Sequence, residues 1–214
     1  MIPLTDKSYL LTEIPFWFQH FAPTFTQIFI EMKTENNICP AEKSWLFSNR
    51  LRNLLQPPKK MLQPYIKEGQ DIVDLGCGPG HFSIPIAKMV GLHGSITCVD
   101  VQQAMLDKVK RKVQGSSLGE IFKFQLCEPD KLHLNSTYDF ALAFYMVHEV
   151  PNKKMFLTEV YDHLKCGGEL LIVEPKGHVN VNDFETMIDL ASSVGFTKVE
   201  EPNYTFSLST LLMK

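Results

Sequence analysis

Residues 73–80 read VDLGCGPG, and this stretch decides the fold. Two aliphatic residues flank an acid, Asp74, and three glycines then follow at every second position, Gly76, Gly78 and Gly80. Glycine adopts backbone angles that a Cβ forbids, and it lets a ligand approach the main chain closely. A strand that ends in such a loop is typical of the first β–α turn of an open α/β sheet, where these sheets bind their ligands.

Short apolar segments and helical patterns alternate along the chain from this loop. Strands are predicted at residues 70–76, 95–101, 121–127, 138–147 and 168–175. Helices are predicted at residues 57–66, 81–90, 102–114, 152–165 and 182–195, after an earlier helical pattern at residues 41–56. Because the strands are short, apolar and separated by helices, we expect them to pair in parallel in a sheet covered on both faces.

The rhythm changes near the C-terminus, where residues 196–203 and 204–213 both read as strands with only a short turn between them. Two such strands pair antiparallel. We therefore predict an α/β fold, a doubly wound, mostly parallel seven-stranded sheet with a C-terminal antiparallel hairpin strand. Residues 1–59 are expected to form a helical and aromatic extension that could act as a lid, and residues 60–214 the ligand-binding domain.

The composition bounds the function. The chain has 214 residues, of which 44% are hydrophobic and 21% charged, so it is long enough to bury one sizeable core. Its formal net charge of −3 argues against nucleic acid as the main partner. The five cysteines include no CxxC pair, which predicts reduced thiols, a cytoplasmic protein and no metal site.

The N-terminal segment IPFWFQHFAPTFTQIFI, residues 14–30, is aromatic and nearly uncharged. It lacks a basic leader and is interrupted by Pro15 and Pro23, so it does not read as a signal peptide. It is also shorter than the roughly 20 continuous apolar residues that span a bilayer. Because MKTENN, from Met32, resembles a bacterial start, residues 1–31 are either genuine or an over-extended gene prediction.

An acid follows the glycine loop at the end of the next strand, Asp100 in CVDV. A carboxylate at that place can accept hydrogen bonds from both hydroxyls of a ribose, so the loop and the acid together indicate a nucleoside ligand. The spacing differs from the GxGxxG fingerprint of NAD and FAD, because the third glycine comes one residue early and His81 takes the sixth position. The chain also lacks the GxxxxGK[ST] loop of nucleotide triphosphatases.

The motifs resemble those of the class I S-adenosylmethionine-dependent methyltransferases. VDLGCGPG is similar to the first motif of that family, VDVQQAML at residues 99–106 to its acidic second motif, and HLKCGGELLIVEP at residues 163–175 to its fifth-strand signature. The C-terminal hairpin resembles the family's seventh strand inserted beside the sixth. The resemblance covers residues 60–214 and implies a Rossmann-like methyltransferase fold, S-adenosylmethionine as cofactor and S-adenosylhomocysteine as product.

The resemblance also implies roles for individual residues. The glycine loop would lie under the methionine part of the cofactor, Asp74 would orient its ammonium group, and Asp100 would hold the ribose. Glu128, after the third strand, would read the adenine amino group, with Asp130 as the alternative. The full cofactor set is Asp74, Gly76, Cys77, Gly78, Gly80, Asp100, Val101, Met105, Glu128 and Phe144.

Catalytic candidates follow the fourth strand. Tyr145, beside Phe144, would border the sulfonium, and His148 in FYMVHEVPN is the candidate general base. A base is needed only if the acceptor carries a proton, as a hydroxyl, an acidic carbon or an ammonium group does. A histidine that merely fixes the loop before Pro151 is the competing interpretation of His148, and Glu149 and His81 are weaker candidates.

The predicted function is methyl transfer to a small-molecule acceptor by in-line displacement. The chain is similar in type to the ubiquinone and menaquinone biosynthesis methyltransferases. Aromatic residues of the N-terminal part would wall a partly apolar acceptor pocket: Phe16, Trp17, Phe18, Phe21, Trp45 and Phe47. The alternative is a non-catalytic S-adenosylmethionine-binding module that acts through this aromatic surface, as a partner-binding or homodimer face.

Overall fold

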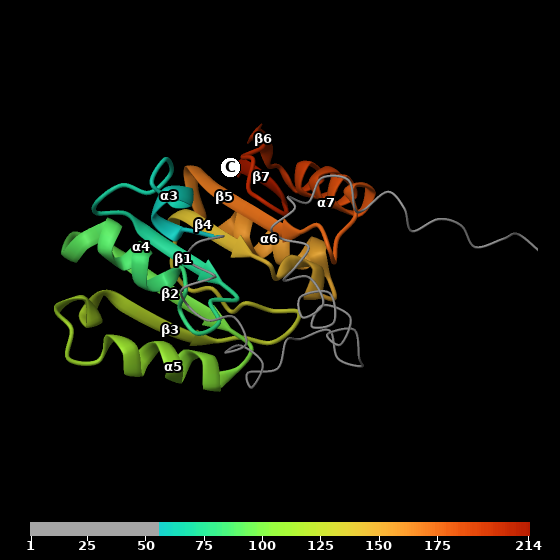
Figure 1. Ribbon diagram of the computed structural model, residues 1–214. Coiled ribbons are helices and arrows are strands. Elements are labelled where there is room, and N and C mark those ends of the chain that lie inside the picture. Colours follow the sequence, from blue (N-terminus) through green and yellow to red (C-terminus); the bar gives the residue numbers. More distant parts are fainter. Residues whose placement is uncertain (1–55) are drawn as a thin grey trace, which may run out of the picture. The chain divides into compact units, whose positions relative to one another are not determined.

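The computed structural model describes residues 56–214, which contain a seven-stranded sheet with the strand order β3-β2-β1-β4-β5-β7-β6 (Figure 1). The strands are β1 (Asp71–Leu75), β2 (Ser95–Asp100), β3 (Phe122–Leu126), β4 (Tyr138–Phe144), β5 (Leu164–Pro175), β6 (Thr197–Glu200) and β7 (Ser207–Met213). The first five pair in parallel, whereas β7 pairs antiparallel with β5 and with β6. The predicted doubly wound sheet with an antiparallel end is confirmed.

Helices connect the strands at the predicted places. They are α3 (Pro58–Leu62), α4 (Ser83–Val90), α5 (Gln103–Val113), α6 (Lys153–His163) and α7 (Val181–Val194), with short 3-10 turns η3 (Gly91–His93), η4 (Ser117–Ile121) and η5 (Val147–Glu149). Pro85 is the third residue of α4, where a missing amide costs little. Asn152 and Asn180 cap α6 and α7 by accepting hydrogen bonds from backbone N–H groups.

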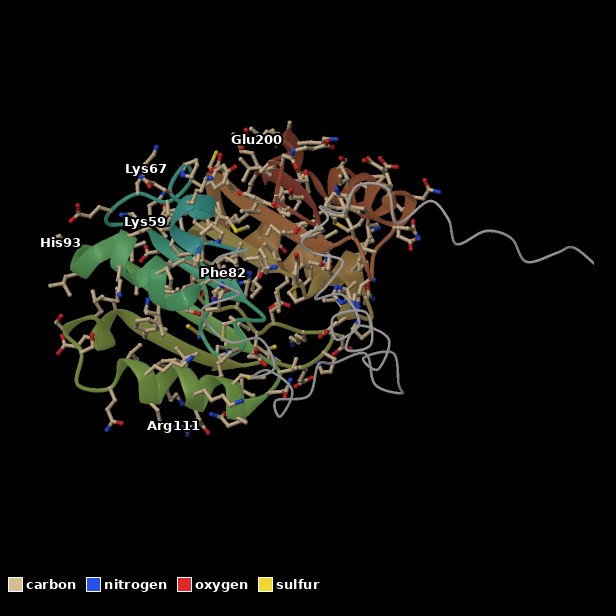
Figure 2. All side chains as sticks on the ribbon, in the orientation of Figure 1. Lys59, Lys67, Phe82, His93, Arg111 and Glu200 are labelled. Atoms are coloured by element: carbon tan, nitrogen blue, oxygen red, sulfur yellow. The ribbon has the colours of Figure 1, made fainter. Side chains whose placement is uncertain are left out.

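Alternating side chains of the strands belong to two separate apolar clusters, one on each face of the sheet. Ile72 of β1 belongs to a cluster with buried residues of α3, α4 and α5. Its neighbours Val73 and Leu75 belong to a cluster with α6 and α7. Helices therefore cover both faces of the sheet, and the central strands are buried almost throughout (Figure 1). In Figure 2, Phe82 lies inside the domain whereas Arg111 projects from its edge.

Strand β5 starts earlier than predicted. It begins at Leu164 rather than at Gly168, because Leu164 already pairs with Tyr138 of β4. The next pair is Phe140 with Glu169, so residues 165–168 form a bulge in the strand. This bulge contains Cys166, between the predicted helix at residues 152–165 and the predicted strand at 168–175, and the N–H of Gly167 donates to the C=O of Lys214.

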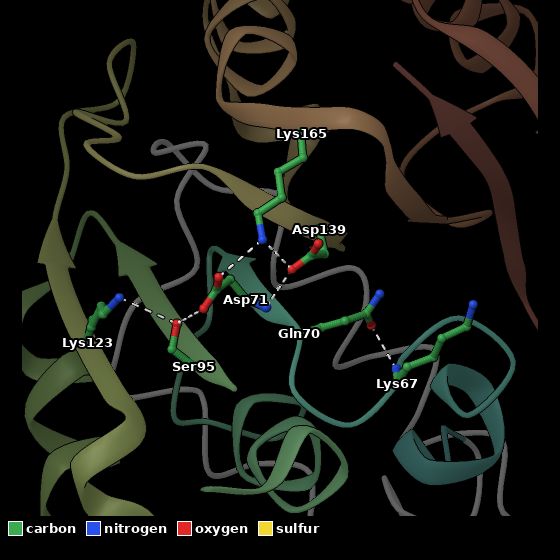
Figure 3. A network of polar contacts seen from close by, with 7 residues as sticks. All are labelled: Lys67, Gln70, Asp71, Ser95, Lys123, Asp139 and Lys165. Carbon is green, nitrogen blue, oxygen red and sulfur yellow. Dashed lines mark hydrogen bonds and ion pairs between the residues drawn. The ribbon is translucent and has the colours of Figure 1, made fainter. Parts of the chain in front are cut away.

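A polar network joins the first residues of the central strands (Figure 3). The Lys165 ammonium lies 2.8 Å from a carboxylate oxygen of Asp139 and 3.2 Å from one of Asp71. The backbone N–H of Asp71 donates to Asp139 over 2.8 Å, and the Ser95 hydroxyl donates to Asp71 over 2.7 Å. The network thus links β1, β2, β4 and β5 at the edge opposite the glycine loop, and its ion pairs are partly exposed.

The predicted division of the chain between residues 59 and 60 falls inside α3. Leu62 of this helix is fully buried in the cluster with α4 and α5. The predicted helix at residues 41–56 and the predicted lid lie outside the described residues, so this division stays a prediction. Within residues 56–214, no helix combines the length and the apolar character that crossing a bilayer requires.

We predict that the core, and not the ionic network, dominates the stability of this domain. Leu171→Ala removes a fully buried side chain between β4 and β7 and should cost about 2–5 kcal/mol of unfolding free energy. Lys165→Ala removes only half-exposed ion pairs and should cost less than about 1 kcal/mol. Urea titrations of both variants check this, and a larger loss for Lys165→Ala would contradict it.

Candidate functional site

The three glycines of the loop all adopt left-handed backbone angles. The φ values are 66° for Gly76, 51° for Gly78 and 85° for Gly80. A side chain is strained in this region, so the sequence needs glycine at all three positions. The loop joins β1 to α4 and places backbone N–H groups beyond the carboxyl end of the sheet, where β1 lies between β2 and β4.

The glycines differ in what a Cβ atom would meet. At Gly76 it would lie 3.0 Å from the side chain of Met146, and at Gly80 it would lie 3.0 Å from Val109 of α5. At Gly78, among residues 56–214, it would meet no atom within 4 Å beyond its two chain neighbours. Gly76 and Gly80 are therefore needed for packing, whereas Gly78 leaves an open cradle at the ligand-binding edge of the sheet.

Asp100 ends β2 and joins two loops. One of its carboxylate oxygens accepts the backbone N–H of Gly78 and the other that of Gln102, each over 2.9 Å. The side chain is buried, and burial raises the pKa of its carboxyl group although the two N–H bonds act in the opposite direction. Each oxygen keeps a second lone pair, so Asp100 can still accept hydrogen bonds from a pair of hydroxyls.

Asp74 is fixed from the helix side of the loop. It is 2% exposed, and its carboxylate accepts a hydrogen bond of 2.5 Å from the hydroxyl of fully buried Ser83 at the start of α4. The bond ties the end of β1 to the helix that follows. The Cys77 thiol is also buried, and a hydrogen bond with Cys98 and burial raise its pKa, so it stays protonated.

Three more residues of the predicted cofactor set follow β2 and β3. Met105 is buried at 4% exposure in α5, whereas Val101 is half-buried directly after β2. The Cys127 N–H donates to the C=O of Asp100 over 3.1 Å, which brings the segment with Glu128 beside it. The Glu128 side chain is 65% exposed and lies 3.1 Å from His133. Its adenine-reading role stays a prediction, as does that of Asp130.

Aromatic side chains line the end of β4. Phe144 packs against Phe82 with 4.2 Å between the ring centroids and against Tyr145 with 4.3 Å. Tyr145 has a φ of 58°, which is unusual for a residue with a side chain. Its N–H donates to the C=O of Val173, and its hydroxyl hydrogen-bonds with that of Ser207 over 2.7 Å. The strained residue is thus held by β5 and β7.

His148 is held by a residue that sequence reasoning did not single out. Its Nδ1 lies 2.5 Å from Oε2 of Glu174, a carboxylate that is 2% exposed near the end of β5. Burial alone would lower the pKa of His148, but the hydrogen bond and charge of Glu174, with the charge of Glu149, raise it above the usual range. The only sequence signal for Glu174 was an acid ending an otherwise apolar strand.

Sequence reasoning also did not single out Ser83 and Met146, because neither carries a local sequence signal. Both act through contacts between segments, Ser83 with Asp74 and Met146 with Gly76, and neither residue type marks such a role. His81, a weaker catalytic candidate, instead lies with its ring nitrogen 3.2 Å from the C=O of Gln56. The structure therefore joins the predicted loop, Asp100 and the end of β4 at one edge, and adds Glu174 behind His148.

Comparison with known proteins shows what the chain is similar to. Residues 72–168 match the family model described as a methyltransferase domain, which covers β1 to the start of β5. This matched region, less than half of the chain, is thus similar to a methyltransferase domain, in line with the resemblance to the class I S-adenosylmethionine-dependent methyltransferases that the motifs carry.

Relatives named for quinone biosynthesis are among those similar to this chain. The chain is 32% identical over 118 residues to a demethylmenaquinone methyltransferase of Lactobacillus johnsonii, a match that covers 54% of this chain and 48% of the relative. It is 29% identical over 112 residues to a ubiquinone/menaquinone biosynthesis C-methyltransferase of Haemophilus ducreyi, covering 51% and 42%. The matched region is less than half the length of each of these two relatives.

Solved structures agree on the fold. A S-adenosylmethionine-dependent methyltransferase from Aquifex aeolicus superposes with a TM-score of 0.72 at 23% identity, covering 82% of this chain and 99% of that one. At this identity the likeness supports the Rossmann-like methyltransferase fold alone. The cofactor of that fold fits the residues present, since Gly78 offers an open cradle and Asp100 keeps acceptor positions beside it.

We predict that Gly78→Ala weakens cofactor binding far more than it weakens the fold. The new Cβ occupies the cradle, so the Kd for S-adenosylhomocysteine should rise tenfold or more, while the positive φ costs about 1–3 kcal/mol of stability. Gly69→Ala is the matched control, because Gly69 also has a positive φ and open space but lies in the loop before β1. Calorimetric titration and thermal melts separate the two effects, and equal Kd changes in both variants would contradict the assignment.

A second prediction concerns pH. The folded state holds the pKa of His148 above its unfolded value of about 6.5. The resulting stability is fully present below that value and is lost as the pH rises through the folded pKa. The unfolding free energy should therefore fall more between pH 6 and 8.5 in the native protein than in His148→Gln. His163→Gln serves as the control and should keep the native fall; equal slopes in all three proteins would refute this.

Proposed function

We propose that this protein is an S-adenosylmethionine-dependent methyltransferase acting on a small-molecule acceptor. The observation that carries the proposal is the hydrogen bond from the Gly78 N–H to Asp100, which fixes the open glycine loop beside a carboxylate with acceptor positions to spare. The methyltransferase match over residues 72–168 supports it. The whole activity remains a proposal because the chain aligns with only part of each relative.

Residues at the carboxyl edge of the sheet would each bind a different part of the cofactor. Gly76, Gly78 and Gly80 would hold the methionine part of the cofactor, Asp100 the ribose, and Phe144 and Tyr145 would border the reacting methyl group. When bound, S-adenosylmethionine supplies an electrophilic methyl carbon that bonds to the acceptor atom as the carbon–sulfur bond breaks toward sulfur, giving S-adenosylhomocysteine. The protein's main contribution is to align the acceptor and to exclude water.

The acceptor is proposed to be small and partly apolar. Exposed apolar side chains lie at the edge of the sheet that carries the glycine loop: Leu126 at the end of β3, Met155 in the first turn of α6, Val181 at the start of α7 and Phe206 before β7. Such side chains suit an acceptor with an apolar ring or tail. Two relatives are named for quinones, which makes a quinone-type ring the first acceptor to test.

The cysteines support a cytoplasmic location for this protein. The four cysteines within residues 56–214 are all unpaired, which suits a reducing compartment such as the cytoplasm. The alternative function, a non-catalytic binding module or homodimer face, would act through the N-terminal segment, outside the described residues. The pairing of His148 with Glu174, at the carboxyl edge of the sheet after β4, supports the enzyme over a binding module, because a binding module has no use for a held imidazole there.

Calorimetry and an enzyme assay test the proposal together. S-Adenosylhomocysteine should bind with micromolar Kd, and Asp100→Ala should weaken binding tenfold or more because the ribose acceptor and the anchor of Gly78 are both lost. Asp189→Ala, an exposed acid on α7, is the control and should bind normally. The enzyme assay uses labelled S-adenosylmethionine with reduced demethylmenaquinone as the first acceptor tested. Absence of cofactor binding in the intact protein would refute the proposal.

A further inference from the structure

We propose that Glu174 is the positioning residue of a carboxylate–imidazole pair, which presents Nε2 of His148 as the base for acceptors that must lose a proton. This inference rests on the proposed methyl transfer and narrows its substrate class. The acceptor atom would be the oxygen of a hydroxyl or phenol, or an acidic carbon such as that of a reduced quinone ring.

Both carboxylate oxygens of Glu174 bind the segment of Val147 and His148. Oε1 accepts the backbone N–H of Val147 over 2.7 Å and that of His148 over 3.3 Å. Oε2 lies 2.5 Å from Nδ1 of the His148 ring. The backbone bonds alone would fix η5, so a purely structural acid has no need of the second oxygen on the ring. The arrangement orients the imidazole as well as the turn.

The pairing also decides which ring nitrogen is available. An ionised carboxylate can only accept hydrogen bonds, so Nδ1 carries the proton in the neutral ring. Nε2 then holds the lone pair and is the nitrogen that can take a proton from an acceptor. It lies 4.0 Å from the Glu149 carboxylate, beyond hydrogen-bond distance.

The pair lies where an acceptor is expected. His148 follows β4 and Glu174 lies near the end of the neighbouring β5, both at the carboxyl edge of the sheet. Two residues before His148, Met146 packs directly against the backbone of Gly76 in the cofactor loop. Tyr145, directly before Met146, is fixed by hydrogen bonds to β5 and β7. The base is thus coupled to the loop through a short, anchored segment of chain.

The proton balance defines the step. The acceptor's hydrogen passes as a proton to Nε2, and the bonding pair stays on the acceptor oxygen or carbon as the nucleophile. The resulting imidazolium is stabilised by the buried Glu174 carboxylate and later releases its proton to solvent. An acceptor that has no ionisable proton, such as a tertiary amine or a thioether, would gain nothing from this pair.

The charged groups around His148 set its pH dependence. Glu174 from β5 and Glu149 from η5 favour the protonated ring, whereas Lys153 at the start of α6 disfavours it. The His178 ring, in the turn after β5, lies 5.5 Å from that of His148. Since the net effect favours the imidazolium, the rate should rise with pH through a midpoint above about 6.5.

Nitrogen NMR of the imidazole tests the pair without any turnover. In the S-adenosylhomocysteine complex above the His148 pKa, the spectrum should show the tautomer with hydrogen on Nδ1. Glu174→Gln should abolish that preference and lower the midpoint below that of the native protein, because burial and the charge of Lys153 are then opposed only by the charge of Glu149. Glu169→Gln, on the same strand and without a histidine partner, should leave both unchanged. Hydrogen on Nε2 in the native protein would overturn the proposal.

Kinetics with reduced demethylmenaquinone test the role. We expect kcat to fall about 100-fold in His148→Gln and about tenfold in Glu174→Gln, with KM and the Kd for S-adenosylhomocysteine within twofold of native. Glu174→Asp should recover part of the loss, and the pH–rate midpoint should match the NMR midpoint. Unchanged kcat in Glu174→Gln, or a loss explained entirely by weaker cofactor binding, would reduce Glu174 to a structural anchor.

The two proposals fail in different ways. Loss of S-adenosylhomocysteine binding in the native protein would refute the methyltransferase proposal, while the NMR experiment on the free protein would still show which nitrogen carries hydrogen. Normal binding and turnover with a pH-independent rate would leave the methyltransferase standing and refute the base.

Discussion

The bonds that Asp100 accepts from the N–H groups of Gly78 and Gln102 organise the ligand-binding edge. They connect the loop after β1 to the loop after β2, so the glycines are held in their left-handed angles before a ligand arrives. Holding the carboxylate in a buried position is unfavourable for its charge, and the two N–H groups offset part of that cost. Binding then requires little reorganisation of the backbone, which is the advantage of a preorganised site.

The sheet supplies the second constraint. Because β1 lies between β2 and β4, the chain leaves β1 toward one face and returns to β4 from the other, and the loops diverge at this point. The cofactor loop after β1 and the acid after β2 lie on one side of that divergence. The aromatic residues and His148 after β4, with Glu174 of β5, lie on the other. In the proposed function, the groups that would bind the cofactor and those that would face the acceptor therefore follow different strands.

Much of this was predictable from local patterns. The apolar runs predicted the strands, the helical patterns between them predicted the helices, and the alternating glycines with Asp100 predicted a nucleoside site whose residues the structure brings together. Features that depend on partners distant in sequence could not be predicted. Glu174 pairs with His148 across 26 residues, and Ser83 is a common residue whose role arises only from its contact with Asp74. The bulge that carries β5 back to Leu164 depends on pairing with β4, which no local propensity encodes.

The contact between Gly76 and Met146 has a consequence for how the loops of this domain can be exchanged. Since a Cβ at position 76 would lie 3.0 Å from the Met146 side chain, the two segments are fitted to each other atom by atom. The loop after β4 therefore cannot be exchanged for that of a relative as an independent module. Any recombination that imports a new loop after β4 must bring a residue at position 146 that leaves the glycine loop its space, so the two loops are inherited as a matched pair.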